Sequence, residues 1–229
     1  MYYGSMDNLG QRPKDDISPT AQRILEHARR VFNERGVAAV GIREIARDLG
    51  MSPGNLSYHF ATKEALVAAL VEQMHSANNA VTTAPAGVLD FVTLDAILRA
   101  LMQRDLENRW LMRDALGFVL SMPSLQPLLE PMHRAREARV DKIVERLIDA
   151  GLLEPARTHR ALAQLRIQLI TQIAFWVPSA LIAAPLHDPA ERLEAHARAA
   201  LALFQPLCTR SGKRQLEQLL DTPTPQSKQ

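Results

Sequence analysis

The sequence predicts an all-α protein. Apolar residues make up 47% of the 229 residues, whereas aromatic residues make up only 5%. Leu and Ala supply most of the apolar content, and both favour helix. No alternating apolar and polar run bounded by turn residues predicts a strand. Apolar residues instead recur at helical spacing in most segments. We therefore expect about nine helices, arranged as a small N-terminal three-helix domain and a larger helical domain.

The first unit is predicted to span residues 18–75, after a polar, disordered arm at residues 1–17. Ser18 and Pro19 suit the N-cap and first turn of a helix, and Gly36 suits its end. Two short helices are expected within residues 42–60. Thr62 can then cap a longer helix with an acidic first turn, which favours the helix macrodipole.

The second unit is predicted to span residues 76–208, after which residues 209–229 form a short helix and a disordered tail rich in Pro, Ser, Thr and Gln. Polar, Pro-containing and Gly-containing stretches punctuate this unit and separate its helices. The expected helices cover residues 91–107, 109–121, 125–150, 158–183 and 189–207, and a weaker one covers residues 213–220.

Composition excludes several classes of protein. The single cysteine, Cys208, cannot form an internal disulfide framework and fits a reducing cytosol. The N-terminal residues lack the apolar core of a signal peptide, and Gly4-Ser5-Met6 resembles a fusion scar. The longest apolar stretch, residues 161–186, contains Gln, Arg and Pro residues, so we interpret it as a buried helix and expect no membrane span. A net charge of +2 argues against a non-specific polycationic binder.

The stretch Ile42–Phe60 predicts a helix-turn-helix. Apolar residues at positions 42, 45, 46 and 49 share one face of a short helix. A corner at Gly50-Met51 follows, and Ser52 can cap a second helix. Leu56 and Phe60 form the narrow inward stripe of that helix. Its outward positions are small or polar and carry no carboxylate, which suits a helix that lies in the major groove of DNA.

Residues 23–74 resemble the tetracycline-repressor (TetR) family of bacterial transcriptional regulators. The resemblance rests on Phe32 ahead of Gly36, the REIA segment, the SPGNLSYHF helix and the following Lys63. Further on, the segments Asp149–Leu153 and Phe175–Pro178 are similar to those of one subgroup. The chain departs from the family at Val40-Gly41, where a Thr or Ser usually caps the first short helix and contacts phosphate.

The resemblance implies a set of DNA-contacting residues. Ser52 and the helix that it caps can meet a phosphate, and Gly54 allows close approach of the backbone. Asn55 and Ser57 are candidates for base edges, whereas Tyr58, His59 and Lys63 suit phosphates. The full set comprises Arg43, Ser52, Gly54, Asn55, Ser57, Tyr58, His59 and Lys63. His59 has no second ligand at helical spacing, so we predict neither a metal site nor a cofactor.

The larger unit is expected to sense a ligand and to form a homodimer. A charge within an apolar stripe needs a partner, so Arg136 either meets a ligand anion, pairs with a nearby glutamate or extends to solvent. The large aromatic and Met side chains of this unit either line an apolar pocket or belong to the core. The predicted pocket residues are Trp110, Phe118, Met122, Arg136, Phe175 and Trp176. The predicted dimer face comprises Leu193, Ala197, Ala200, Leu201 and Phe204, with the small residues Ala195, Ala199 and Ala202 beside it.

Three functions compete. The leading one is a cytoplasmic, homodimeric repressor that binds a palindromic DNA operator and is released by a small, apolar or amphipathic effector. A second is a helix-turn-helix regulator that responds to a protein partner or to no effector. The third, an enzyme, is disfavoured because the chain lacks a nucleophile elbow, a zinc-binding H-E-x-x-H and a phosphate loop.

Overall fold

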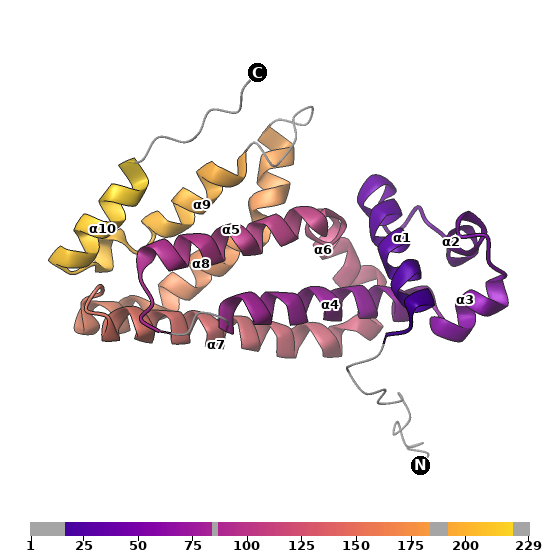
Figure 1. The fold of residues 1–229 in the computed structure, drawn as a ribbon, viewed down its shortest axis with the longest axis horizontal. Helices are drawn as coiled ribbons and strands as arrows, with labels where there is room; N and C mark the ends of the chain where they lie inside the picture. Colours follow the sequence, from indigo (N-terminus) through magenta and orange to yellow (C-terminus); the bar gives the residue numbers. More distant parts are fainter. Residues whose placement is uncertain (1–16, 84–86, 184–191, 222–229) are drawn as a thin grey trace, which may run out of the picture.

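The computed structural model describes residues 17–83, 87–183 and 192–221, and these residues form ten α-helices and two short 3₁₀ helices (Figure 1). The all-α prediction is confirmed. In chain order the elements are α1 (Pro19–Arg35), α2 (Ile42–Asp48), α3 (Pro53–His59), α4 (Lys63–Thr83), α5 (Phe91–Glu107), α6 (Arg109–Ser121), η1 (Pro123–Leu125), α7 (Gln126–Asp149), α8 (Pro155–Ala183), α9 (Leu193–Ala202), η3 (Gln205–Leu207) and α10 (Arg210–Asp221).

The helix boundaries follow local signals in the sequence. The Ser18 hydroxyl accepts a hydrogen bond from the Ala21 N–H at 3.2 Å, and α1 ends at Gly36, whose φ of 80° suits glycine. The Thr62 hydroxyl accepts from the Ala65 N–H in the same way. Gly50, at φ 66°, makes the corner between α2 and α3. The capping residues therefore predicted the ends of the N-terminal helices correctly.

Some boundaries differ from the prediction. The helix expected from residue 125 begins with the 3₁₀ turn η1, and α8 begins at Pro155 rather than residue 158. The helix expected over residues 189–207 divides into α9 and η3, and the last helix is longer than predicted, at residues 210–221. The predicted arm up to residue 16, its Gly4-Ser5-Met6 segment, residues 184–191 and the tail after residue 221 lie outside the described residues.

The molecule is elongated, with α1–α3 at one end and the larger helical body at the other (Figure 1). One apolar cluster joins α1, α2, α3 and the first half of α4, and Trp110 and Leu125 from the larger body belong to the same cluster. A second cluster lies among α5, α7, α8, α9 and α10. Helix α4 runs from the first unit into the second, where it packs against α5 and α7. The two units therefore share packed side chains.

Helix α9 is an internal helix of the single chain. Ala197, Ala200, Leu201 and Phe204 are at most 1% exposed, and α9 packs chiefly on α5. These four side chains cannot reach a second copy, so the prediction that they form a dimer face is wrong for them; Leu193 is only partly buried. The stripe was assigned to the wrong partner, because periodicity shows which face is apolar but not what covers it.

Helix α8 carries apolar residues that the described part of the chain leaves exposed. By length and composition alone it is apolar enough to cross a membrane, and only 33% of its most apolar window is buried, which differs from the buried helix predicted for this stretch. Its inner side packs against α5, α6, α7 and α9. Ile167, Phe175 and Ile182 are 69%, 58% and 82% exposed. One face of α8 is thus core, and another is apolar and exposed.

Candidate DNA-binding surface and internal cavity

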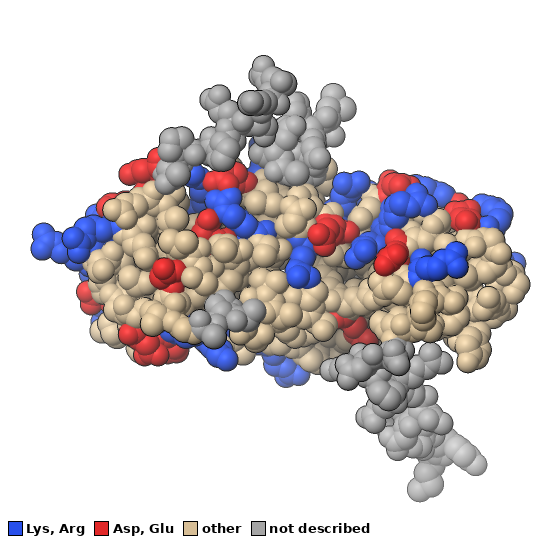
Figure 2. All heavy atoms as spheres, viewed as in Figure 1, with Lys and Arg blue, Asp and Glu red and all other residues tan. Residues whose placement is uncertain are grey.

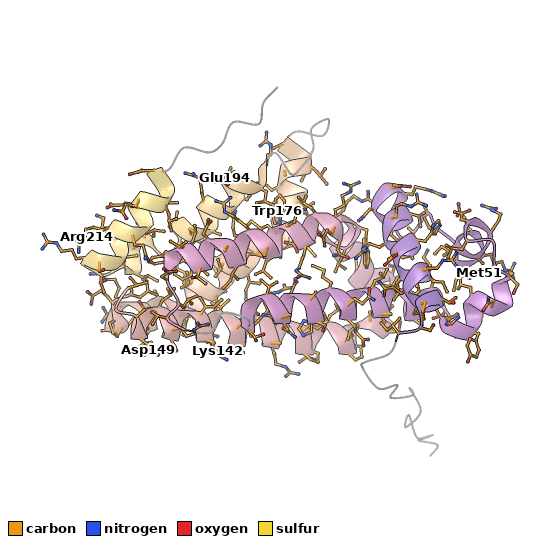
Figure 3. All side chains as sticks on the ribbon, in the orientation of Figure 1. Met51, Lys142, Asp149, Trp176, Glu194 and Arg214 are labelled. Atoms are coloured by element: carbon orange, nitrogen blue, oxygen red, sulfur yellow. The ribbon has the colours of Figure 1, made fainter. Side chains whose placement is uncertain are left out.

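Helix α3 is held by two buried side chains and presents the rest of its surface to solvent. Leu56 is 1% exposed and Phe60, directly after the helix, is 9% exposed. The Ser52 hydroxyl caps the helix by accepting from the Asn55 N–H at 3.1 Å. Met51, in the corner between α2 and α3, lies at the far end of the molecule from Arg214 of α10 (Figure 3). The helix is therefore rigidly attached at one extremity of the structure.

The predicted DNA-contacting residues share this extremity. Arg43, Ser52, Gly54, Asn55, Ser57 and Tyr58 are exposed, whereas His59 and Lys63 are partly buried. Tyr58 is 74% exposed, and its ring meets the His59 ring edge-on at a centroid distance of 5.2 Å. Burial lowers the pKa of Lys63. A large, rigid aromatic side chain held this far into solvent is unusual for a structural residue.

Ion pairs with α1 hold the carboxylates of α2. Arg35 donates to Glu44, and this hydrogen bond lowers the pKa of the Glu44 carboxyl. Asp48 lies 3.4 Å from His27 Nε2. Arg47 lies 3.8 Å from Glu44 and 3.7 Å from Asp48, and its side chain is 74% exposed. The two acidic groups are thus tied to α1, which reduces their repulsion of a phosphate backbone.

Arg47 is a candidate contact that the sequence reasoning missed. It follows Arg43 by four residues, so both lie on one face of α2. That spacing was visible in the sequence, but the set of DNA contacts implied by the family resemblance did not include Arg47. Basic and acidic residues are interspersed on the face drawn in Figure 2, which agrees with the small net charge.

The departure at Gly41 has the expected structural effect. Gly41 is the N-cap residue of α2, and no side chain accepts a hydrogen bond there. The first turn of α2 has lost the hydroxyl that the family usually places at this point.

A cavity of about 240 Å³ lies inside the larger unit. Helices α4, α5, α6, α7 and α8 all contribute to its wall, as does Leu125 of η1. Most of the lining is aliphatic. Val71 of α4 belongs both to this wall and to the apolar cluster of the DNA-binding end. Helix α4 is therefore one element that connects the cavity with α1–α3, and Leu125 of η1 belongs to both the wall and the cluster as well.

Among the described side chains, three ionisable ones face the cavity: Asp105, Arg136 and Arg139. Asp105 is 4% exposed and accepts a hydrogen bond from Trp176 Nε1 at 3.0 Å. Burial raises the pKa of Asp105 to about 7, against the opposing effects of Trp176 and Arg136. Burial also lowers the pKa of Arg136, although Asp105 partly offsets this effect. Charged groups at the wall of an apolar cavity are typical of a ligand site.

The predicted pocket residues divide into three groups. Arg136 and Phe175 line the cavity. Trp176 lies behind the wall, in the middle of the larger unit, and acts through its bond to Asp105 (Figure 3). Trp110 and Met122 instead join the cluster around α1, where the Trp110 ring packs on Phe32 at 5.8 Å, so their assignment to the pocket is wrong. The side chain of Phe118 lies outside the described residues.

Comparison with known proteins agrees with this architecture. Residues 24–70 match the family model described as bacterial regulatory proteins, tetR family, and residues 69–216 match the model described as bacterial transcriptional repressor. The regulator UidR of Escherichia coli K12 is 38% identical over 68 residues, which are 30% of this chain and 33% of UidR. The regulator TtgR of Pseudomonas putida is 30% identical over 93 residues, which are 41% of this chain and 44% of TtgR.

The fold also matches solved structures. A TetR-family regulator from Marinobacter aquaeolei VT8 superposes with a TM-score of 0.79, at 21% identity, over 89% of this chain and 98% of that one. An exposed helix-turn-helix joined to a helical body with an internal cavity defines a DNA-binding transcriptional regulator. The matched models cover most of the sequence, and the chain belongs to the TetR family of bacterial transcriptional regulators.

Proposed function

We propose that this chain is a cytoplasmic, ligand-responsive repressor that binds a palindromic operator as a homodimer. The observation that carries the proposal is the position of α4. Its first half packs with α1–α3, and its second half lines the cavity with Asn78 and Thr82. A ligand that displaces α4 changes where α3 lies relative to its copy in the dimer.

The proposed mechanism is a shift between two conformations. One has a separation of the two α3 helices that fits successive major grooves, and the other does not. The effector releases the operator only in so far as it binds the second conformation more tightly. The DNA contacts proposed are those of α2 and α3, with Arg43, Asn55, Ser57 and Tyr58 at the centre.

The test is selection of binding sites from random duplex DNA at physiological salt, followed by titration of the enriched site. We expect a palindrome of two short half-sites. Tyr58→Ala should weaken binding at least tenfold, because the contact is lost in both half-sites. Tyr58 is 74% exposed, so the variant should keep the wild-type melting temperature.

Glu72→Ala serves as the control, because Glu72 is an exposed residue of α4 on no proposed contact surface. The proposal would be contradicted if the wild-type chain bound DNA in a salt-sensitive way but without any sequence preference. An unchanged operator affinity of Tyr58→Ala would contradict the assigned role of α3.

A further inference from the structure

We propose that the cavity binds a small aliphatic monoanion, such as a carboxylate, with its head group at Arg136 and Arg139 and its hydrocarbon part along the aliphatic wall. This inference rests on the proposed ligand response, because it names the class of effector. Four features of the cavity support it: the kind of apolar surface, the excess of positive charge, the state of the one acidic group and an unsatisfied polar atom.

The apolar wall suits hydrocarbon rather than an aromatic ring system. Leu, Ile and Val side chains from α5, α7 and α8 supply most of it. Phe175 is the one aromatic side chain recorded in the wall, and because it is also 58% exposed it lies where the cavity meets the surface. The inner part of the described wall therefore offers no ring for stacking. Its volume, about 240 Å³, lies near the lower end for ligand sites and suits a short chain or a compact branched group.

The positive charge of the cavity exceeds its negative charge. Arg136 and Arg139 lie three residues apart on α7, and burial, together with the positive charge of Arg136, lowers the pKa of Arg139. Arg139 donates to Asn79 Oδ1, a neutral acceptor. Among the described residues, Arg136 makes no hydrogen bond or ion pair. Arg136 is partly buried and faces the cavity, so an anion bound there would supply the partner that its guanidinium lacks among these residues.

Among the side chains that the structure describes, the neighbouring helices do not supply the missing anion. On α4 the polar residues at the wall, Asn78 and Thr82, are neutral. On α8 Arg166 pairs with Asp141 of α7, so that carboxylate is already used. Within the described wall, Asp105 of α5 is the one acidic residue.

Asp105 is a weak counter-ion. Its raised pKa, about 7, means that the carboxyl is protonated in a large fraction of molecules at neutral pH. Trp176 already donates to its Oδ2 atom. In the protonated form Asp105 can donate to a ligand oxygen instead of competing with the ligand for Arg136. Asp105 and Arg136 can thus hold the same head group.

The Asn78 side chain adds a further unsatisfied polar group. Its Oδ1 atom is buried without a hydrogen-bond partner, and Asn78 lines the cavity. Buried amide oxygens rarely lack a partner. A bound molecule with a polar end, or the water that accompanies it, would supply one.

The experiment is calorimetric titration of the full chain with three probes that share one hydrocarbon chain: octanoate, octanol and octylamine. We expect octanoate to bind at least tenfold more tightly than octanol, and octylamine to bind more weakly than either. Arg136→Gln should weaken octanoate roughly 10- to 100-fold, because one charge-assisted hydrogen bond is lost, and should leave octanol little changed.

The matched control is Arg134→Gln, on the same helix, because Arg134 is an exposed residue whose side chain pairs with Glu130. It should bind octanoate like the wild type. Arg139→Gln provides a second variant should Arg136→Gln fail to fold, and should also weaken octanoate. Hexanoate and decanoate, titrated alongside, locate the chain length that the cavity accepts.

Each outcome separates the two proposals. The monoanion proposal would be overturned if octanoate and octanol bound equally, if octylamine bound most tightly, or if no carboxylate bound. It would also be overturned if both arginine variants bound octanoate like the wild type. If octanoate binding depends on Arg136 but leaves operator affinity unchanged, the proposal of a monoanion site stands and the proposal of a ligand-responsive repressor is overturned. Both proposals would be supported if octanoate releases the wild-type chain from the operator but does not release Arg136→Gln, which should still bind DNA.

Discussion

At the scale of single residues, burial decides which ionisable groups have unusual properties. Tyr58 is among the most exposed large side chains of the described residues, whereas Asp105 is among the few buried polar ones. Glu194 shows the opposite case to Asp105, since hydrogen bonds from Arg99 and Arg198 lower the pKa of its carboxyl to about 2. A carboxyl group thus has a pKa near neutrality at Asp105 and a strongly acidic pKa at Glu194.

Asp105 should make stability fall as the pH rises towards neutrality. Its pKa is raised from an ordinary value of 3.8 to about 7, so the folded chain binds the proton more tightly than the unfolded chain does. The stabilisation is fully present below pH 3.8 and is lost as the pH rises from there to about 7. Asp105→Asn, which retains an acceptor for Trp176, should remove this loss. Denaturant unfolding of both chains across that range measures it.

Other groups contribute to the pH dependence of both chains equally, so the relevant quantity is the difference between wild type and Asp105→Asn. Glu194 acts in the opposite sense, because its lowered pKa gives stability that is lost as the pH falls towards about 2. A difference that stays constant from acid to neutral pH would contradict the assigned role of Asp105.

At the scale of secondary-structure elements, α8 raises the question of what covers its outer face. Five exposed residues follow one another at intervals of four: Ala163, Ile167, Thr171, Phe175 and Ser179. Ala195 and Ala199 of the adjoining α9 are at least partly exposed as well. Small and apolar residues allow close approach of helices. We propose that this face, rather than the buried side of α9, forms the homodimer.

A charge on this face should separate the two copies. Ile167 is 69% exposed in the single chain, so Ile167→Glu should leave the fold intact but place a carboxylate in the dimer interface. Light scattering should show that the mass falls from two chains to one. Val92→Glu is the matched control, because Val92 is 54% exposed on α5, and it should remain dimeric. If both variants behave alike, the outer face of α8 is not the interface.

At the scale of the whole molecule, Asn33 is a polar link between the DNA-binding end and the larger unit. Asn33 of α1 donates through Nδ2 to the Glu107 carbonyl at 2.8 Å and accepts from the Trp110 N–H through Oδ1 at 3.0 Å. It thus bridges α1 to the junction of α5 and α6. Because α5 and α6 both line the cavity, this bridge provides a route, besides α4, by which a ligand can affect α1.

Replacement of Asn33 should reduce the coupling between the two sites rather than the affinity of either. In Asn33→Ala we expect effector binding within about twofold of wild type, and an effect of the effector on operator affinity reduced roughly fivefold, which lies within the usual range of coupling energies. Operator titrations with and without octanoate, or whichever effector binds, measure the coupling. Asn55→Ala provides the contrast, since it should weaken DNA binding itself. Full coupling in Asn33→Ala would rule out this bridge as a route.

The sequence by itself determined the all-α fold, the helix-turn-helix and most helix boundaries. These features depend on local signals such as the caps Ser18, Ser52 and Thr62 and the glycines at positive φ, which act within a few residues of the chain. The candidate DNA-contacting positions follow from the same local pattern, since α3 buries little more than Leu56 and Phe60.

Only the tertiary structure decided what each apolar face meets. Periodicity identified the stripe on α9 and the large side chains of α6, but it could not tell a dimer face from the core around Phe204, or a pocket from the packing of Trp110 on Phe32. The cavity with Asp105 and Arg136 lies among α4, α5, α6, α7 and α8, whose wall residues are far apart in the sequence. Burial and charge pairing are properties of such long-range contacts, and no local pattern encodes them.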